Sequence, residues 1–199
     1  MLSNLIRQRA QAVLNIIARG LGSLGLTPNA LTIIGFLMMC GIGAVLATGN
    51  FALGGALIIA AGIFDALDGT LARLTNRVTK FGAFLDSTTD RFAEGALYFG
   101  IMYAFMQRGM DWVAYLVFFT LLGSLMVSYA RARAEGIGVE MKEGLMTRFE
   151  RIALLVIGLL LTAFFGQTPI LIVLGILAVL TNFTAGQRIW LVYKATQQP

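Results

Sequence analysis

Four aspartates at regular spacing are the residues of this sequence that could carry out chemistry. Asp65 and Asp68 are three positions apart, and Asp86 and Asp90 are four apart, between long apolar segments. On a helix each pair would point to one face. A carboxylate inside an apolar, membrane-type segment is costly and by default marks a functional site. Two such pairs on adjacent helices would form an all-oxygen pocket suited to hard divalent cations, and two ions would cancel its formal charge.

The alternative is a structural salt-bridge network in which Arg73 and Arg91 neutralise the acids. Gly69 and Gly82 favour the metal pocket, because a ligand can approach a helix closely where a side chain is missing. The sequence has no histidine and one cysteine, Cys40. Histidine acid–base chemistry, the usual zinc sites and an internal disulfide are therefore excluded. An enzyme of this composition would have to work with carboxylates and metal.

The elements that position these residues are predicted to lie in a membrane. The chain has 199 residues, of which 58% are hydrophobic and 13% charged, and its mean hydropathy is +0.81. A soluble fold of this length could not bury so much apolar surface, so we expect an all-α integral membrane protein forming a single domain over residues 1–199. Arg7 and Arg9 lie where a signal peptide would have its apolar core, so we expect no cleaved leader.

Helical periodicity and turn residues predict the individual elements. Residues 2–20 alternate apolar and polar positions as an amphipathic helix lying in the membrane interface. Six transmembrane helices follow within 28–194, at about 30–48, 52–74, 81–106, 112–134, 148–166 and 168–194. The first aspartate pair lies near the end of the second span, and the other pair lies in the first half of the third.

The distribution of positive charge predicts the orientation. Fourteen of the fifteen Lys and Arg residues lie in the N-terminal helix, in the loop between the second and third spans, in the loop between the fourth and fifth spans, at the helix ends beside these loops, or at the C-terminus. Only Arg108 lies elsewhere. The positive-inside rule places both termini and all four aspartates on the cytoplasmic side of the cell membrane.

The aspartate region carries a family resemblance. It resembles the complete signature of the CDP-alcohol phosphotransferases, Asp65-x2-Asp68-Gly69-x2-Ala72-Arg73-x8-Gly82-x3-Asp86-x3-Asp90. The predicted six spans with a preceding interfacial helix are also similar to that family. The resemblance implies metal-dependent transfer of a substituted phosphoryl group from a CDP-linked lipid to an alcohol, with release of CMP. It also implies a homodimer.

The resemblance implies a role for each motif residue. Asp65, Asp68 and Asp86 would ligate two Mg²⁺ or Mn²⁺ ions, and Asp90 would ligate one of them and act as general base on the acceptor hydroxyl. The residues implied to bind the CDP-lipid are Asn29, Thr32, Asp65, Asp68, Gly69, Arg73, Thr79 and Gly82. In-line displacement at phosphorus needs charge neutralisation and positioning more than covalent help, which agrees with these roles.

A second, basic group lies at the predicted cytoplasmic ends of the last three spans. Its members are Ser128, Arg131, Arg148, Arg151 and Arg188. Ordinary positive-inside charge explains any one arginine taken alone. Arg148 and Arg151, however, share one face at a helix start, where the dipole favours anions. Together these residues would suit a phosphate carried by the acceptor.

A narrower resemblance concerns the acceptor. The segments Ser128-Tyr-Ala-Arg131-Ala-Arg-Ala-Glu-Gly136 and Arg148-Phe-Glu-Arg151 are similar to the phosphatidylinositol-phosphate synthase branch of the family. Arg131 stands where lysine is usual, and Phe149 where proline is usual. The resemblance implies CDP-diacylglycerol and inositol 1-phosphate as substrates. Glycerol 3-phosphate as acceptor, giving phosphatidylglycerol phosphate, and an archaetidylinositol-phosphate synthase remain alternatives.

Two other classes of protein are considered. A divalent-cation transporter would also use intramembrane aspartates, but it requires polar residues across the full membrane depth, and the outer halves of the predicted spans are almost wholly apolar. A metal-stabilised scaffold without turnover would have no need for Gly69, Gly82 and Arg73. We expect the lipid bilayer as a partner and no nucleic acid.

Overall fold

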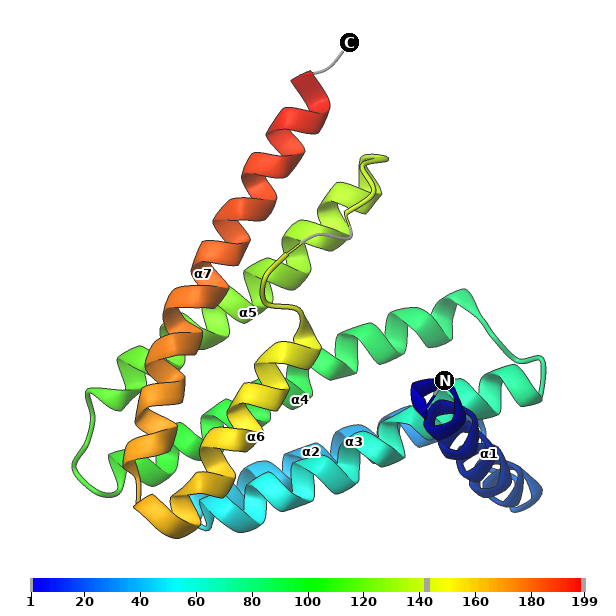
Figure 1. Cartoon of the computed structure of the whole chain (residues 1–199), viewed down its shortest axis with the longest axis horizontal. Coiled ribbons are helices and arrows are strands. Elements are labelled where there is room, and N and C mark those ends of the chain that lie inside the picture. Colours follow the sequence, from blue (N-terminus) through cyan, green and yellow to red (C-terminus); the bar gives the residue numbers. More distant parts are fainter. Residues whose placement is uncertain (1, 142–143, 198–199) are drawn as a thin grey trace. The chain divides into compact units, whose positions relative to one another are not determined.

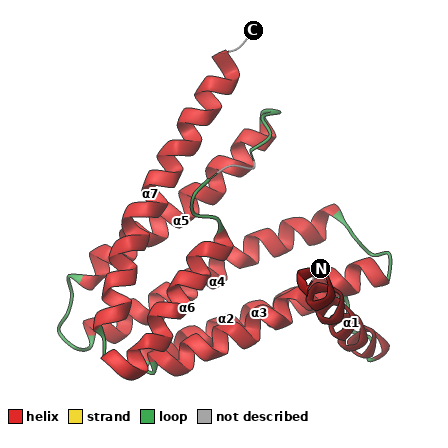
Figure 2. Cartoon of the chain, in the orientation of Figure 1, coloured by secondary structure: helices red, strands yellow, loops and turns green. Residues whose placement is uncertain are grey.

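The described part of the chain is entirely helical. In this computed structural model the backbone is described for residues 2–141 and 144–197, and the side chains for residues 11–141 and 144–197. Seven helices and no strand occur there (Figures 1 and 2). They are α1 (Leu2–Ser23), α2 (Pro28–Ala47), α3 (Phe51–Leu74), α4 (Lys80–Met106), α5 (Val113–Gly136), α6 (Arg148–Phe165) and α7 (Thr168–Gln197). The all-α prediction is confirmed, and each helix ends within three residues of its predicted bounds.

Four of these helices are long and apolar enough to cross a membrane. They are α2, α3, α5 and α7 among the described residues. Helix α4 carries Asp86, Asp90, Arg91 and Glu94, and α6 begins with three charged residues among its first four. The side chains of residues 2–10, on which the amphipathic pattern of α1 partly rests, lie outside the described residues.

The chain forms two compact units. Unit 1 comprises Met1–Ile42 and Leu57–Ala96, and unit 2 comprises Gly43–Ala56 and Leu97–Pro199. All four aspartates belong to unit 1, whereas the predicted acceptor-phosphate residues belong to unit 2.

The core of unit 1 joins α1 to α2 and α3. Ala18, Leu31, Leu67 and Leu71 are buried at its centre. A Cβ on Gly22 would lie 2.9 Å from the Cδ1 atom of Leu71, so this glycine allows α1 to approach α3 closely. The packing fixes the C-terminal half of α1 beside the end of α3 that carries Asp65 and Asp68.

Local turn chemistry sets the helix ends at the aspartates. Helix α2 begins at Pro28, and the hydroxyl of Thr27 accepts a hydrogen bond from the backbone N–H of Ala30 at 3.2 Å. After α3, Asn76 adopts a left-handed conformation with φ of 53°. The hydroxyl of Thr79 accepts from the N–H of Gly82 at 2.9 Å and caps α4. A short turn thus joins the two helices that carry the aspartate pairs.

In unit 2, helix α7 packs against α5 and α6. Glycines permit the close contacts: a Cβ on Gly123 would overlap the hydroxyl oxygen of Thr181, and one on Gly158 would lie 2.8 Å from Val173. This packing brings residues from the ends of three helices together in the basic group described below.

Candidate active site

Three aspartates of unit 1 converge on one point. Asp65 and Asp68 of α3 and Asp86 of α4 each offer one carboxylate oxygen, and these oxygens lie within 4.8 Å of one another. All three side chains are partly buried. Three carboxylates at this separation repel one another unless a cation lies among them. Their donor set consists of oxygen atoms only, which fits a hard divalent ion such as Mg²⁺ or Mn²⁺.

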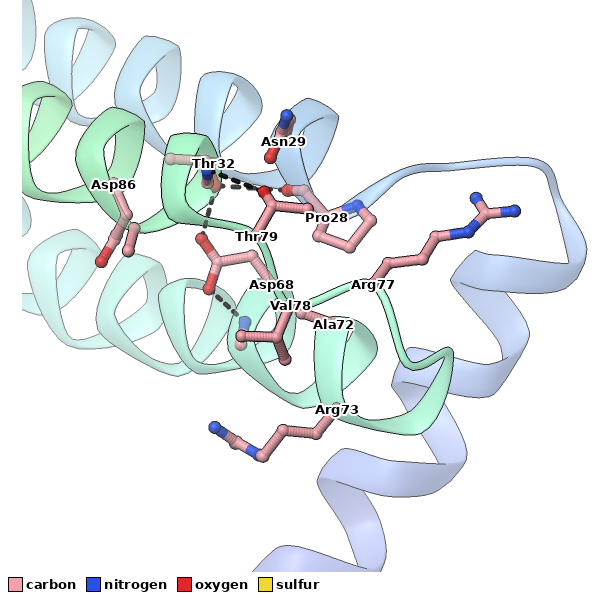
Figure 3. Close-up of a pocket in the computed structure, with 13 residues that line it drawn as sticks. Pro28, Asn29, Thr32, Asp68, Ala72, Arg73, Arg77, Val78, Thr79 and Asp86 are labelled. Carbon is pink, nitrogen blue, oxygen red and sulfur yellow. Dashed lines mark hydrogen bonds between the residues drawn. The ribbon is translucent and has the colours of Figure 1, made fainter.

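Hydrogen bonds from two elements orient the carboxylate of Asp68. Its Oδ2 atom accepts from the hydroxyl of Thr32 at 2.7 Å, and its Oδ1 atom accepts from the backbone N–H of Gly69 at 2.5 Å (Figure 3). Thr32 lies on α2 and is only 8% exposed. Helix α2 therefore holds a carboxylate of α3 in place.

A cavity of about 310 Å³ opens beside these carboxylates. Thirteen residues line it: Pro28, Asn29, Thr32, Asp68, Gly69, Ala72, Arg73, Arg77, Val78, Thr79, Gly82, Ala83 and Asp86 (Figure 3). Every residue predicted to bind the CDP-lipid is among them except Asp65, which belongs to the carboxylate group instead. A volume of this size suits a ligand of a few hundred daltons.

Gly82 lines this cavity at a place where little room is left for a side chain. A Cβ there would lie 3.1 Å from Thr79 Oγ1 and 3.2 Å from Asn29 Oδ1. A side chain would press on both polar groups, so the missing side chain keeps the starts of α2 and α4 close together. Arg73 is exposed, and its Nη2 atom donates to the hydroxyl of Thr70 at 3.3 Å. Its guanidinium has further N–H donors of the kind that bind a phosphate oxygen.

Asp90 lies one turn beyond Asp86 and is not part of the three-carboxylate group. Its Oδ2 atom is 3.9 Å from Nη1 of Arg91, and its side chain is 13% exposed. The same Arg91 nitrogen donates to the backbone carbonyl of Ser87. The ion pair considered in the sequence analysis as an alternative is thus present for Asp90. Glu94, a further turn along α4, is buried.

The basic group of unit 2 is built around two buried arginines. Arg151 is 1% exposed and Arg188 is 3% exposed. Nη1 of Arg188 donates to the carbonyl of Val127 at 2.6 Å, and Nη1 of Arg151 donates to the carbonyl of Met146 at 3.3 Å. The Nε atom of Arg188 is buried and has no hydrogen-bond partner among the described residues. Such a donor is costly unless a ligand or water accepts from it.

The other members of the group lie nearer the surface. Arg131 pairs with Glu135 at 2.8 Å, and both side chains are about half exposed. Ser128 and Arg148 are partly buried. Among the described residues, the positive charges of Arg131 and Arg151 act on Arg188, and the carboxylate of Glu135 acts in the opposite sense. The group therefore has an excess of positive charge, which favours an anionic ligand.

The chain is similar to known proteins over most of its length. The family model for CDP-alcohol phosphatidyltransferases matches residues 25–184. The chain belongs to this family. It is 40% identical to an archaetidylinositol phosphate synthase of Pyrococcus horikoshii over 93% of both chains. It is 33% identical to a phosphatidylinositol phosphate synthase of Mycobacteroides abscessus, over 92% of this chain and 85% of the relative.

Solved structures of a Mycobacterium tuberculosis phosphatidylinositol phosphate synthase have a similar fold. The structure with CDP-DAG bound has a TM-score of 0.84 and 31% identity, and covers 92% of this chain and 94% of its own. The structure in complex with manganese and citrate has a TM-score of 0.82 and 30% identity. The match covers 90% of this chain and 88% of the mycobacterial chain.

Sequence reasoning about this phosphatidyltransferase gave no site role to five residues that line the cavity: Pro28, Ala72, Arg77, Val78 and Ala83. Pro28 stands at the start of the predicted transmembrane region 28–194, and Arg77 lies among the positive charges of the loop between the second and third predicted spans. The signal for Arg77 was its position. A cation in the short turn between two aspartate-bearing helices must lie at the same end of the helices as the aspartates.

Proposed function

We propose that this phosphatidyltransferase transfers a phosphatidyl group from CDP-diacylglycerol to inositol 1-phosphate, giving phosphatidylinositol phosphate and CMP. The observation that carries the proposal is the three-carboxylate group opening into a cavity that Thr32, Gly69 and Arg73 line. The similarity to phosphatidylinositol phosphate synthases, one of them solved with CDP-DAG, supports the choice of donor and acceptor.

The acidic cavity would receive the CDP part of the donor. Asp65, Asp68 and Asp86 would hold two Mg²⁺ or Mn²⁺ ions, with Asp90 contacting one of them. When bound, such ions neutralise the pyrophosphate and stabilise the leaving CMP. Thr32 keeps the Asp68 carboxylate oriented for its ligand role. The manganese complex of the mycobacterial enzyme supports the use of a divalent ion.

The remaining residues of the cavity would position the donor. Arg73 would donate to a phosphate oxygen, and Asn29 and Thr79 would face the nucleotide. Gly82 leaves room for it. Asp90 would accept the proton of the attacking hydroxyl as the new P–O bond forms. Its place outside the three-carboxylate group suits a base, because a carboxylate shared fully by metal ions is a poor proton acceptor.

The basic group of unit 2 would bind the phosphate of the acceptor. Buried Nε of Arg188 supplies a donor that lacks a partner among the described residues, and Arg131, Arg148 and Arg151 supply further positive charge. Ser128 would add a hydroxyl. A phosphorylated acceptor would account for the buried guanidinium of Arg188 at the end of an apolar bundle, because a buried donor is costly until an acceptor pairs with it.

We further propose that residues 1–199 act as one membrane domain. Six transmembrane helices within 28–194, including α4 and α6, would follow α1, whose residues 2–20 would lie in the interface. Both termini and the site would face the cytoplasm of the cell membrane, and the enzyme would work as a homodimer. The family match over residues 25–184 runs through both units and supports a single functional domain.

A second candidate differs only in the donor. The 40% identity to an archaetidylinositol phosphate synthase is the observation that supports a CDP-linked archaeol as the donor. Both candidates use an inositol phosphate acceptor. The donor is decided by offering each CDP-lipid to the purified enzyme and comparing kcat/KM, and a preference of tenfold or more for the archaeol donor, about 1.4 kcal/mol, would replace the first candidate by the second.

An acceptor panel tests the reaction itself. The purified enzyme is incubated with CDP-diacylglycerol and inositol 1-phosphate, glycerol 3-phosphate or inositol, with Mg²⁺, Mn²⁺ or a chelator. CMP release is expected only with a divalent ion and inositol 1-phosphate. Product from glycerol 3-phosphate alone would indicate a phosphatidylglycerol-phosphate synthase. Turnover unchanged by the chelator would contradict the metal role of the carboxylates.

A further inference from the structure

Unit 1 contains a second cavity that the proposed reaction does not use. Its volume is about 530 Å³, and it lies where the end of α1 and the turn before α2 meet the end of α3. Pro28 and Arg77 line both this cavity and the acidic one, so the two cavities share a wall. Figure 3 shows the Arg77 side chain extending away from Asp68, toward the turn that connects α1 and α2.

The charges of this second cavity are positive. Arg19 of α1 and Arg77 line it, and no acidic residue is among its described lining residues. Both arginines are exposed, and among the described residues neither guanidinium has a hydrogen-bond or ion-pair partner. A guanidinium presents a planar fork of donors that matches a phosphate oxygen pair. Two such groups around one cavity favour a phosphate-bearing ligand.

The remaining wall is apolar. Leu26, Leu71 and Leu74 line it, and the neighbouring surface of unit 1 exposes Leu24 to 78%. Leu71 is buried in the core of unit 1, and a free phosphate ion would not cover the parts of Leu26 and Leu74 that stay accessible. A ligand that joins a phosphate to hydrocarbon would satisfy both walls at once, because apolar atoms gain free energy when they leave water.

We propose that this cavity binds the phosphate headgroup of an anionic phospholipid, at a site separate from the one for the CDP-lipid. Arg19 and Arg77 contact the phosphate, and Leu26 and Leu74 contact the glycerol and the first carbons of the chains. Basic pockets beside membrane helices are suited to such headgroups, since the surface charge of the bilayer concentrates them there.

Because the two cavities share a wall, a lipid bound in the second cavity would also affect the acidic cavity. Pro28 begins α2, and the next residues of that helix include Asn29 and Thr32 of the acidic cavity. A headgroup held by Arg77 would order the turn before α2 and therefore the wall that the CDP part contacts. Anionic lipid is expected to lower the KM for the CDP-lipid.

Lipid binding is measured without substrates. The full-length protein, purified and delipidated in a neutral detergent, is titrated with phosphatidylglycerol or with phosphatidylcholine of the same chains, and native mass spectrometry counts the bound lipid. The decisive variant is Arg19→Gln, because Arg19 lines only the second cavity. Lys194→Gln is the matched control: it removes one positive charge from the exposed end of α7, where the ammonium lies over Trp190.

One saturable phosphatidylglycerol per chain is expected in the wild type and in Lys194→Gln, with about tenfold weaker binding in Arg19→Gln. Equal affinity in Arg19→Gln and the wild type, or equal retention of phosphatidylcholine, would overturn the proposal. Displacement of the lipid by inorganic phosphate at a similar concentration would assign the cavity to a free phosphate instead. No CDP-lipid or acceptor is present, so the result is independent of the proposed reaction.

Discussion

The acidic site of unit 1 and the basic group of unit 2 are built in different ways. The acidic site takes its carboxylates from two consecutive helices joined by a short turn, and the carboxylates are only partly buried. The basic group takes its arginines from three helices spread between residues 131 and 188, and two of them are almost wholly buried.

Their supporting contacts differ as well. Asp68 is oriented by a side-chain hydroxyl and a backbone N–H, while its neighbours Asp65 and Asp86 add like charge. Arg151 and Arg188 are held by backbone carbonyls, which makes them part of the packing of unit 2. The acidic site should therefore be needed for activity but lower the stability of the fold, whereas the basic group should contribute to activity and to stability. Four substitutions test this difference.

Asp86→Asn should have the largest effect on activity and should not lower stability. Removing one of three converging carboxylates weakens metal binding, which supplies several kcal/mol of transition-state stabilisation, so kcat/KM should fall by about 10⁴-fold. The loss of like-charge repulsion should leave the melting temperature, measured without metal, equal or higher. A lower melting temperature would show that Asp86 stabilises the fold, and the acidic site would then not differ from the basic group in this respect.

Asp90→Asn should lower kcat by about 10³-fold, in the range of a lost general base. Because Asp90 is outside the three-carboxylate group, the dissociation constant of the CDP-lipid should change little. Turnover and equilibrium binding of the CDP-lipid are measured on the same preparation. Unchanged turnover would exclude the base role, and a parallel loss of CDP-lipid binding would make Asp90 a binding residue.

Arg188→Gln should affect both activity and stability. It removes the donor to the Val127 carbonyl and the buried positive charge, so the melting temperature should fall and the KM for the acceptor should rise by about 30-fold. The KM for the CDP-lipid serves as the internal control and should change much less. Equal changes in both KM values would show that the substitution only disturbs the fold.

Gly82→Ala should give the smallest effect. The new methyl group would lie 3.1 Å from Thr79 Oγ1 and 3.2 Å from Asn29 Oδ1, so the KM for the CDP-lipid should rise about threefold, equivalent to a fraction of a kcal/mol. Gly95→Ala, also on α4, is the control, because its added Cβ meets no atom within 4 Å. An equal KM in the two variants would contradict the close approach as the reason for Gly82.

The sequence predicted some features of the site better than others. The spacing of Asp65 and Asp68 predicted a shared helix face, and Asn29, Thr32, Arg73 and Thr79 do line one cavity with Asp68. The predicted roles of Ser128, Arg131, Arg148, Arg151 and Arg188 stay predictions, although the burial of Arg151 and Arg188 exceeds what ordinary positive-inside charge requires. Burial of this kind depends on how α7 packs against α5 and α6, which no spacing along one helix specifies.

By itself, the sequence determined the helices and the pairing of acids along them. Apolar runs bounded by proline, glycine and polar turns set where each helix begins and ends, because those preferences act between residues close in the chain. Only the tertiary structure decided that Thr32 of α2 holds Asp68 of α3, that Asp90 lies outside the carboxylate group, and that Arg77 stands between two cavities. These facts depend on the rotation and separation of packed helices, which are set by side-chain contacts far apart in the sequence.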